Sequence, residues 1–201
     1  MASDAIRSVR ADDLDAVYAI CLQTSDAGSD ATALHDDPHL PGHVWAAPYV
    51  VHEPDHGFVT VDANDRPTGY ALGALDSRAF EARLEREWWP RLRQQYPLGV
   101  ERRPADAESV RLIHSPPVAA DDVVSTYPSH LHIDLLPTAQ GRGAGRRLID
   151  TLLAALVDAG SCGVHLGVDP RNQRAIGFYE AIGFTRLSPG TPSAIFGRRL
   201  E

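Results

Sequence analysis

A glycine-dense run from Gln140 to Gly145 carries the pattern in this 201-residue chain that most directly indicates chemistry. Residues 129–136 before it alternate polar and apolar side chains as a strand does, and residues 146–157 after it carry Leu and Ile at helical spacing. Backbone N–H groups in the first turn of a helix have no intrahelical partner, and glycines let them approach a ligand closely. Because the helix dipole also favours negative charge there, the segment predicts a site for a phosphate-bearing ligand, with Arg142 and Arg146 beside it.

Spacing excludes two common phosphate-binding patterns. A dinucleotide fingerprint requires G-x-G-x-x-G, but its last place falls on Arg146 or Leu148, depending on the starting glycine. A Walker loop requires lysine, and all 19 basic residues are arginine. The pattern that remains is Gln/Arg-x-x-Gly-x-Gly/Ala with an upstream proline, which is matched by Pro137, Gln140, Gly143 and Gly145.

A second segment, Asn172 to Phe184, has the features of a capped helix followed by a strand. Tyr179 and Ile182 fall three residues apart, and Gly183 stands where a C-cap glycine belongs. The Asn, Ala, Phe-Tyr-Glu and Gly-Phe positions of this segment, together with the glycine run, resemble the Gcn5-related N-acetyltransferase (GNAT) superfamily. In that superfamily the loop cradles the pyrophosphate of coenzyme A.

The resemblance implies an α/β fold in which a central mixed, splayed β-sheet has helices on both faces. We expect one GNAT domain over residues 1–201, with a helical insertion over about 76–128 between the third and fourth strands. Asp12 and Asp13 are expected to cap the first helix, and residues 25–53 to form a loop with at most one short helix. The strands expected elsewhere are residues 5–10, 58–62, 68–75, 163–168 and 193–199.

The insertion carries an apolar stripe with helical spacing. Pro90 should kink this helix or start a second one. The stripe is expected to pack in the core, and its other readings are a wall over the acceptor site or a dimer contact. Its members are Phe80, Leu84, Trp88, Leu92 and Tyr96.

One branch of the superfamily is more similar still, namely the acetyltransferase-like domains at the C-terminus of O-GlcNAcases. The similar features are residues 69–76, the insertion with Trp88 or Trp89, residues 127–129 and the strand that holds Asp134. The resemblance covers nearly the whole chain and is weakest in residues 25–57. Eukaryotic members of that branch lack the glycine loop, whereas this chain has it, which favours cofactor binding.

The resemblance implies direct transfer, in which an amine attacks the thioester of acetyl-CoA in a ternary complex. Backbone N–H groups of Leu135 and Leu136, where the strand should splay, would hold the thioester carbonyl. Tyr179 stands at the position of the family's general acid. The residues that the resemblance assigns to coenzyme A are Leu135, Leu136, Gln140, Gly141, Arg142, Gly143, Ala144, Gly145, Arg146, Asn172, Phe178 and Tyr179.

The general base is less clearly marked. The usual positions before the loop hold Leu131 and Ser129, neither of which is a strong base. The same predicted strand presents His132 and Asp134 on its polar face, and Asp76 ends the strand before it. We expect Asp134 to act as the base with Asp76 as its helper, while a salt bridge or a helix cap is the other reading for each carboxylate.

Composition limits the partners. The formal net charge of −8 argues against nucleic acid and mildly favours a cationic acceptor, which we expect to be a primary amine on a small molecule or a lysine side chain. No secretion signal or apolar run of membrane-spanning length is seen, so a cytoplasmic protein without a membrane partner is expected. Neither Cys21 and Cys162 nor the scattered histidines show metal-ligand spacing, so no metal is expected.

Two other functions stay open from sequence. The chain could be a non-catalytic acyl-CoA-binding or regulatory domain, as the residues at the usual base positions allow. It could also be a GNAT-shaped protein-interaction module that uses the aromatic insertion. A homodimer is compatible with each reading. Acetyl-CoA binding with turnover distinguishes the enzyme from both alternatives.

Overall fold

The structure is a computed structural model that describes residues 5–188 and 194–200. Its centre is a seven-stranded mixed sheet in the order β1-β2-β3-β4-β5-β7-β6, in which β4 and β5 are parallel neighbours and the other neighbouring pairs are antiparallel. The mixed sheet is therefore confirmed. The strands are β1 Ala5–Ser8, β2 Gly57–Val61, β3 Pro67–Ala74, β4 Ser129–Leu135, β5 Gly163–Val168, β6 Thr185–Ser188 and β7 Ala194–Arg199.

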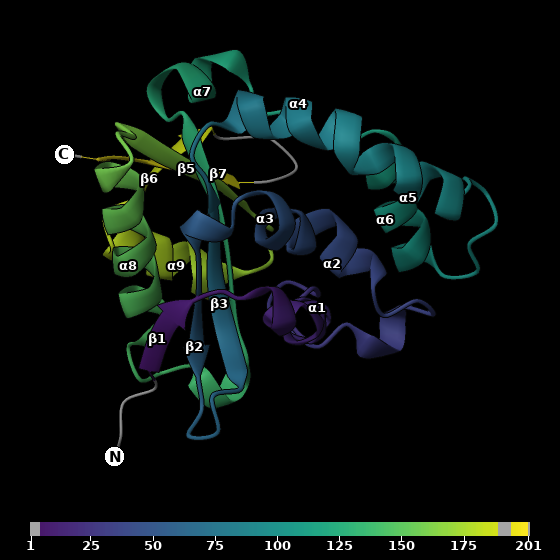
Figure 1. The fold of residues 1–201 in the computed structure, drawn as a ribbon, viewed down its shortest axis with the longest axis horizontal. Coiled ribbons are helices and arrows are strands. Elements are labelled where there is room, and N and C mark those ends of the chain that lie inside the picture. The colour runs from purple at the N-terminus through teal and green to yellow at the C-terminus, as the bar shows by residue number, and fades with distance from the viewer. Residues whose placement is uncertain (1–4, 189–193, 201) are drawn as a thin grey trace.

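Helices cover both faces of this sheet, as expected. Figure 1 shows α8 and α9 on one side of the strands and α1, α2 and α3 on the other. Helices α4, α5 and α6 extend from the second side, and α7 lies at the upper end of the strands. Within the described residues none of the helices is long and apolar enough to span a membrane. The helices are α1 Leu14–Leu22, α2 Leu40–Trp45, α3 Ala47–His52, α4 Ser77–Glu87, α5 Trp89–Gln95, α6 Pro104–His114, α7 Asp121–Thr126, α8 Ala144–Asp158 and α9 Gln173–Ala181.

The parallel pair β4 and β5 separates along its length. The two strands pair at Ser129 with Val164 and at His130 with His165, which is where β4 begins. The rest of β4 has β3 as its partner on one side only. The sheet therefore opens toward the carboxyl end of β4, where the predicted site residues lie.

Helix α8 closes one face of the opening. Leu148, Ile149, Leu152 and Leu156 recur at helical spacing and are fully buried in a cluster shared with α9 and the central strands. Full burial of such a side chain contributes roughly 1.5–3 kcal/mol. This packing fixes the N-terminal end of α8, and with it the glycine loop, against the end of β4.

The insertion lies between β3 and β4 and consists of α4 to α7. Pro90 stands in the first turn of α5, so it starts a second helix instead of kinking the first. Phe80, Leu84 and Leu92 are buried in a cluster with α2 and the end of β3, while Trp88 and Tyr96 pack against that cluster. The apolar stripe is therefore core.

The expectation of a loop with at most one short helix over residues 25–53 is wrong, because α2 and α3 both form there. Pro41 and Pro48 stand in their first turns, where a missing N–H costs nothing. Gly42 allows close packing, since a Cβ at this position would lie 2.2 Å from the ring of Tyr18. Tertiary packing thus outweighs the loop-like composition. The start of the last expected strand, Ser193, lies outside the described residues.

Candidate active site

A cleft of about 700 Å³ lies at the open end of β4. Four segments meet around it: the loop after α1, the end of β4, the glycine loop with the start of α8, and the start of α9. The lining residues are Thr24, Ala27, Gly28, Ser29, Ile133, Asp134, Leu135, Gln140, Gly141, Gly143, Gly145, Arg146, Arg171, Asn172, Gln173, Arg174, Ala175, Phe178 and Tyr179.

The glycine loop has a backbone that requires glycine. Gly141 and Gly143 have φ angles of +77° and +74°, which other residues adopt only with strain, and Gly143 is the N-cap of α8. The N–H of Arg147 donates to the carbonyl of Gly143 and closes the first turn of the helix. N–H groups before that bond, including that of Gly145, are the ones an anion in the cleft would reach.

Side chains pin this loop in place. The Nε2 of Gln140 donates to the carbonyl of Leu135 at 2.7 Å, and its Oε1 accepts from Arg174 on α9. Gln140 therefore ties the loop to both β4 and α9. A Cβ added to Gly145 would lie 3.5 Å from both Leu135 and Phe178, so these side chains pack directly against the helix start.

Three residues expected at the cofactor do not line the cleft. Arg142 and Ala144 alternate with the lining glycines, and Ala144 is buried at the base of α8. Leu136 donates its N–H to the carbonyl of Thr68 at 2.9 Å, so this group completes the β3–β4 ladder. That N–H is thus engaged and is not available to a thioester.

The backbone N–H of Leu135 points away from β3, opposite to that of Leu136. Residues of an antiparallel strand point their N–H groups alternately toward and away from the partner strand. Since Leu136 donates toward β3, Leu135 and Ile133 point theirs toward the gap between β4 and β5. Both residues line the cleft. The opening of the sheet therefore leaves a pair of strand N–H groups facing a ligand site.

Tyr179 and Asp134 also face this cleft. Tyr179 lies on α9 and is 7% exposed, and burial, reinforced by the negative charge of Asp134, raises the pKa of its phenol. The phenol therefore keeps its proton at neutral pH, as an acid must. Asp134 accepts a hydrogen bond from the hydroxyl of Tyr70 on β3 at 2.6 Å, which orients the carboxylate.

His132 accompanies Asp134 on the same face of β4. Its Nε2 lies 3.0 Å from Oδ2 of Asp134, and its ring stacks on the half-exposed Trp45 with centroids 6.4 Å apart. Burial alone would lower the pKa of His132, but attraction to Asp134 and contact with Cys21 outweigh it and raise that pKa to about 10.

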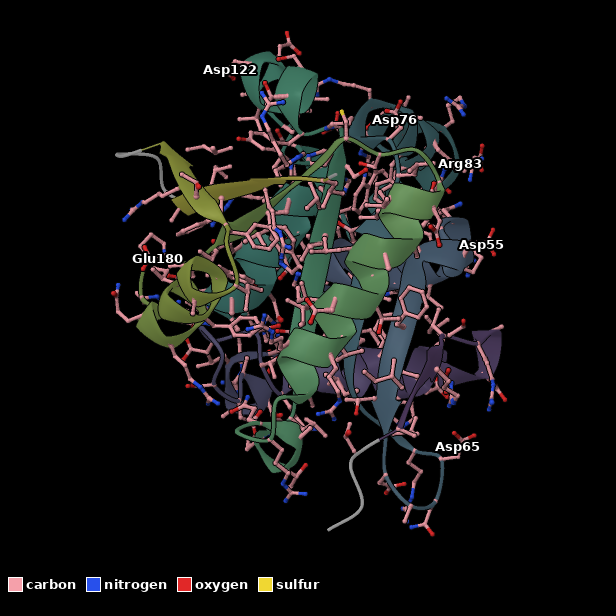
Figure 2. All side chains as sticks on the ribbon, turned by 90° about the vertical axis from the view of Figure 1, so that its left-hand side faces the viewer. Asp55, Asp65, Asp76, Arg83, Asp122 and Glu180 are labelled. Atoms are coloured by element: carbon pink, nitrogen blue, oxygen red, sulfur yellow. The ribbon has the colours of Figure 1, made fainter. Side chains whose placement is uncertain are left out.

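The structure does not bring Asp76 to this cleft. Its carboxylate accepts the N–H of Ala79 at 2.9 Å as the N-cap of α4, which is the capping role that the sequence left open. Asp134 pairs with Tyr70, six residues before Asp76, and six strand residues span roughly 20 Å. Figure 2 shows Asp76 near α7, at the end of the sheet away from the turn that holds Asp65.

Asn172 is the cap of α9 and also lies at the cleft. Its side-chain oxygen accepts the N–H of Ala175 at 3.0 Å as the cap of α9, and the residue lines the cleft. Gly28 approaches it so closely that a Cβ there would lie 2.9 Å from Nδ2 of Asn172. The sequence analysis missed this wall of residues 24–29. In the sequence, Gly28 was the available signal for a tight turn. In the structure, Ala27 and Gly28 have φ angles of +49° and +89°.

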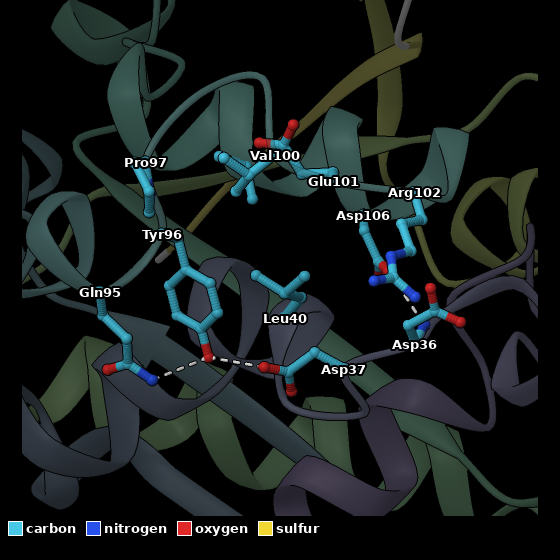
Figure 3. A pocket seen from close by; sticks show the side chains of 11 residues that line it. Asp36, Asp37, Leu40, Gln95, Tyr96, Pro97, Val100, Glu101, Arg102 and Asp106 are labelled. Carbon is cyan, nitrogen blue, oxygen red and sulfur yellow. Dashed lines mark hydrogen bonds between the residues drawn. The ribbon is translucent and has the colours of Figure 1, made fainter.

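A second cavity, of about 300 Å³, lies between the segment before α2 and the insertion (Figure 3). Its polar groups bind one another: the hydroxyl of Tyr96 donates to Asp37 at 2.9 Å and accepts from Gln95, and Asp106 accepts the N–H of Asp36. These contacts attach the insertion to the core. The strand N–H groups, the glycine loop, Tyr179 and Asp134 belong to the larger cleft.

This fold and cleft define a class of protein. The model of the Acetyltransferase (GNAT) family matches residues 22–184, which is most of the chain, and the chain therefore belongs to that family.

Individual relatives agree with this assignment. The crystal structure of SsHAT is 39% identical and superposes with a TM-score of 0.92 over 100% of both chains. Protein O-GlcNAcase of Rattus norvegicus is 27% identical over 92% of this chain, which corresponds to 21% of that protein; the Mus musculus protein gives the same values. The chain thus spans about a fifth of these curated relatives. A phosphinothricin acetyltransferase of Sinorhizobium meliloti solved with AcCoA, 14% identical over 99% of this chain and 89% of its own with a TM-score of 0.58, shares the fold.

Proposed function

We propose that the chain binds acetyl-CoA in the larger cleft and transfers the acetyl group to a primary amine. The observation that carries this proposal is the meeting of three features in one cavity: the glycine loop at the start of α8, the N–H groups at the gap in the sheet, and the Asp134–Tyr179 pair. The donor set fits the ligand, because pyrophosphate prefers a helix N-terminus and a thioester oxygen requires N–H donors.

Acetyl-CoA supplies a thioester whose carbonyl carbon forms a bond with the amine nitrogen as its bond to sulfur breaks. The N–H of Leu135 donates to the carbonyl oxygen as charge develops there, an interaction worth roughly 3 kcal/mol when preorganised. The carboxylate of Asp134 accepts the proton that the amine loses. Tyr179 gives its phenolic proton to the departing sulfur and regains one from water.

The acceptor reaches Asp134 from the side of α1 and α2. Trp45, which is 38% exposed, stacks on His132 there and offers an apolar surface beside the carboxylate. The formal net charge of −8 attracts a cationic acceptor. We therefore propose an amine that arrives protonated and loses that first proton to water before it attacks, either on a small molecule or on a lysine side chain.

Calorimetric titration of acetyl-CoA into the protein tests the cofactor site, with Gly143→Asp as the test variant. Aspartate is a good N-cap and tolerates positive φ better than most residues, so the helix should survive. Its carboxylate would, however, occupy the N–H groups and repel the pyrophosphate. The matched control is Gly160→Asp, which places the same residue at φ +92° beyond the other end of α8, where nothing lies within 4 Å.

We expect binding in the wild type and in Gly160→Asp and its loss in Gly143→Asp. Equal binding by all three proteins would show that the glycine loop does not contribute to the acetyl-CoA site. Binding without acetyl transfer to any amine in a panel of polyamines and lysine peptides would select the acyl-CoA-binding alternative. Absence of acetyl-CoA binding in the wild type would leave a protein-interaction module as the remaining function.

A further inference from the structure

Three side chains with metal-binding atoms converge beside the cleft. Cys21 lies on α1, while His132 and Asp134 are two residues apart on β4 and so share a face of the sheet. One ligand atom from each lies within 4.8 Å of the others, and among residues 5–188 and 194–200 this is the one group of three or more His, Cys, Asp or Glu residues that does so. The packing of α1 on the sheet creates the group, which is why spacing along the chain does not show it.

The donor set matches a thiophilic divalent cation. Thiolate, imidazole and carboxylate are the three ligand types that Zn²⁺ takes in proteins, with bonds of about 2.0–2.3 Å. Tetrahedral geometry then places ligand atoms about 3.5 Å apart. Nε2 of His132 and Oδ2 of Asp134 are already 3.0 Å apart, so closure around an ion requires small movements of side chains alone.

The ring nitrogen of His132 gives an independent indication. Nε2 is buried, and no aligned hydrogen-bond partner for it is present in the described part of the chain. Its 3.0 Å contact with Asp134 has the distance of a hydrogen bond but lacks the alignment. Buried polar atoms in folded proteins are nearly always hydrogen-bonded, and this nitrogen has only the ion-pair contact with Asp134, so a cation between the thiol and the carboxylate would complete its coordination.

The surroundings resemble the outer shell of a metal site. The hydroxyl of Tyr70 donates to Oδ2 of Asp134, and the ring of Trp45 stacks on His132 with an angle of 24° between planes. Such contacts fix the orientation of ligating side chains. Asp134 also lines the cleft, which gives an ion a path of entry and leaves a fourth position for water.

We propose that Cys21, His132 and Asp134 form a binding site for a thiophilic divalent cation, with its fourth position open to the cleft. An ion bound there occupies the carboxylate that accepts the amine proton. Binding of Zn²⁺ therefore inhibits acetyl transfer, a consequence that rests on the proposed function, whereas the binding site itself does not.

Titration with Co²⁺ tests the site directly, because cobalt bound to a thiolate gives a charge-transfer band in the near ultraviolet that aqueous cobalt lacks. We expect one equivalent of Co²⁺ to produce the band in the wild type and in Cys162→Ser, and Zn²⁺ to abolish it by displacement. Cys21→Ser should lack the band. Absence of the band in the wild type, or its dependence on the exposed Cys162, would overturn the proposal.

Two further variants exclude misfolding as the cause. Cys21→Ala removes the ligand without adding a polar atom to a buried position, and retention of the wild-type melting temperature shows that it folds. Tyr70→Phe removes the outer-shell hydrogen bond and should weaken Zn²⁺ binding by roughly 10–100-fold, with all three ligands retained. Unchanged Zn²⁺ affinity in a folded Cys21→Ala protein would contradict the site.

Activity assays separate this inference from the proposed function. Zn²⁺ should inhibit acetyl transfer by the wild type and by Cys162→Ser, and a chelator should restore it. Cys21→Ala should lose the inhibition, as shown by equal rates of the same variant before and after Zn²⁺ is added. A cobalt band without acetyl transfer would overturn the proposed function and support the metal site. Acetyl transfer without a cobalt band would support the function and overturn the metal site.

Discussion

The two walls of the larger cleft are built in different ways. The glycine-loop wall consists of two short segments, residues 140–146 and the start of α9, and offers backbone N–H groups. The β4 wall presents Asp134 to the cleft, and Asp134 is in turn surrounded by Cys21, Tyr70 and His132, which come from α1, β3 and β4. The first wall depends on local backbone conformation, and the second depends on how distant elements pack. Ligand binding and proton transfer should therefore be separable by substitution.

The largest effect is expected from Asp134→Asn on the β4 wall. Loss of the proton acceptor should lower kcat/KM by about 1,000-fold, within the range for general-base catalysis, while the Kd of acetyl-CoA stays unchanged. Steady-state kinetics and calorimetry on the same preparation measure the two quantities. Asp76→Asn is the matched control, because asparagine caps a helix as well as aspartate and this residue lies outside the cleft. Equal losses in both variants would contradict the assignment.

Tyr179→Phe should give the next largest effect. The ring keeps its packing in the cluster around α8 and α9, but the proton for the sulfur is lost, so kcat should fall by about 100-fold at unchanged acetyl-CoA affinity. Poor thiol leaving groups should be affected more than good ones, so an acyl thioester of lower thiol pKa should recover part of the rate. Tyr49→Phe, at a partly buried tyrosine outside the cleft lining, is the control. A rate unchanged by Tyr179→Phe would assign this tyrosine to packing alone.

The difference between the walls also explains what could be predicted from sequence. The glycine loop, the α9 cap and the individual strands follow from local patterns, since turns, helix caps and strand alternation depend on neighbouring residues. The mixed sheet was expected from the family resemblance. Asp134 was found because alternation along β4 places it on the polar face. Cys21 and Tyr70 could not be found, because no local pattern places α1 and β3 against Asp134. Asp76 was misplaced as a helper for the same reason: the direction of β3 carries it away from the cleft.

Gly28→Ala tests the contact where the two walls meet, and a smaller effect is expected. The backbone there has φ +89°, and the new Cβ would lie 2.9 Å from Nδ2 of Asn172, so roughly 1–3 kcal/mol of unfolding free energy should be lost. Acetyl-CoA affinity should fall only a few-fold, because the glycine loop is intact. Gly177→Ala, in the interior of α9 with nothing within 4 Å of the added atom, should instead raise stability by about 0.5–1 kcal/mol. Denaturant unfolding compares the two, and equal shifts of the same sign would refute the close contact.

The last effect concerns the pH dependence of stability, and it should come from the side of the sheet that carries the β4 wall. Burial of the α2 residue His43 lowers its pKa to about 4, against opposing attraction from Asp37 and with additional repulsion from His39 and Arg91. Since the unfolded chain binds this proton below about pH 6.5 and the folded chain does not, stability should fall as the pH drops from 6.5 to 4 and should not depend on His43 above that window.

His43→Gln should therefore flatten the melting-temperature profile between pH 6.5 and 4. Glutamine can still meet the hydroxyl of Tyr18, which lies 2.7 Å from Nδ1 of His43. Some slope should persist, because burial of His130 on β4 lowers its pKa to about 3 and adds a penalty of the same sign. A variant profile parallel to that of the wild type across this window, with a constant offset, would show that His43 titrates normally in the fold. The acid sensitivity would then rest on the other histidines whose pKa burial lowers, namely His52, His130 and His165, and His130→Gln would test one of them by the same scan.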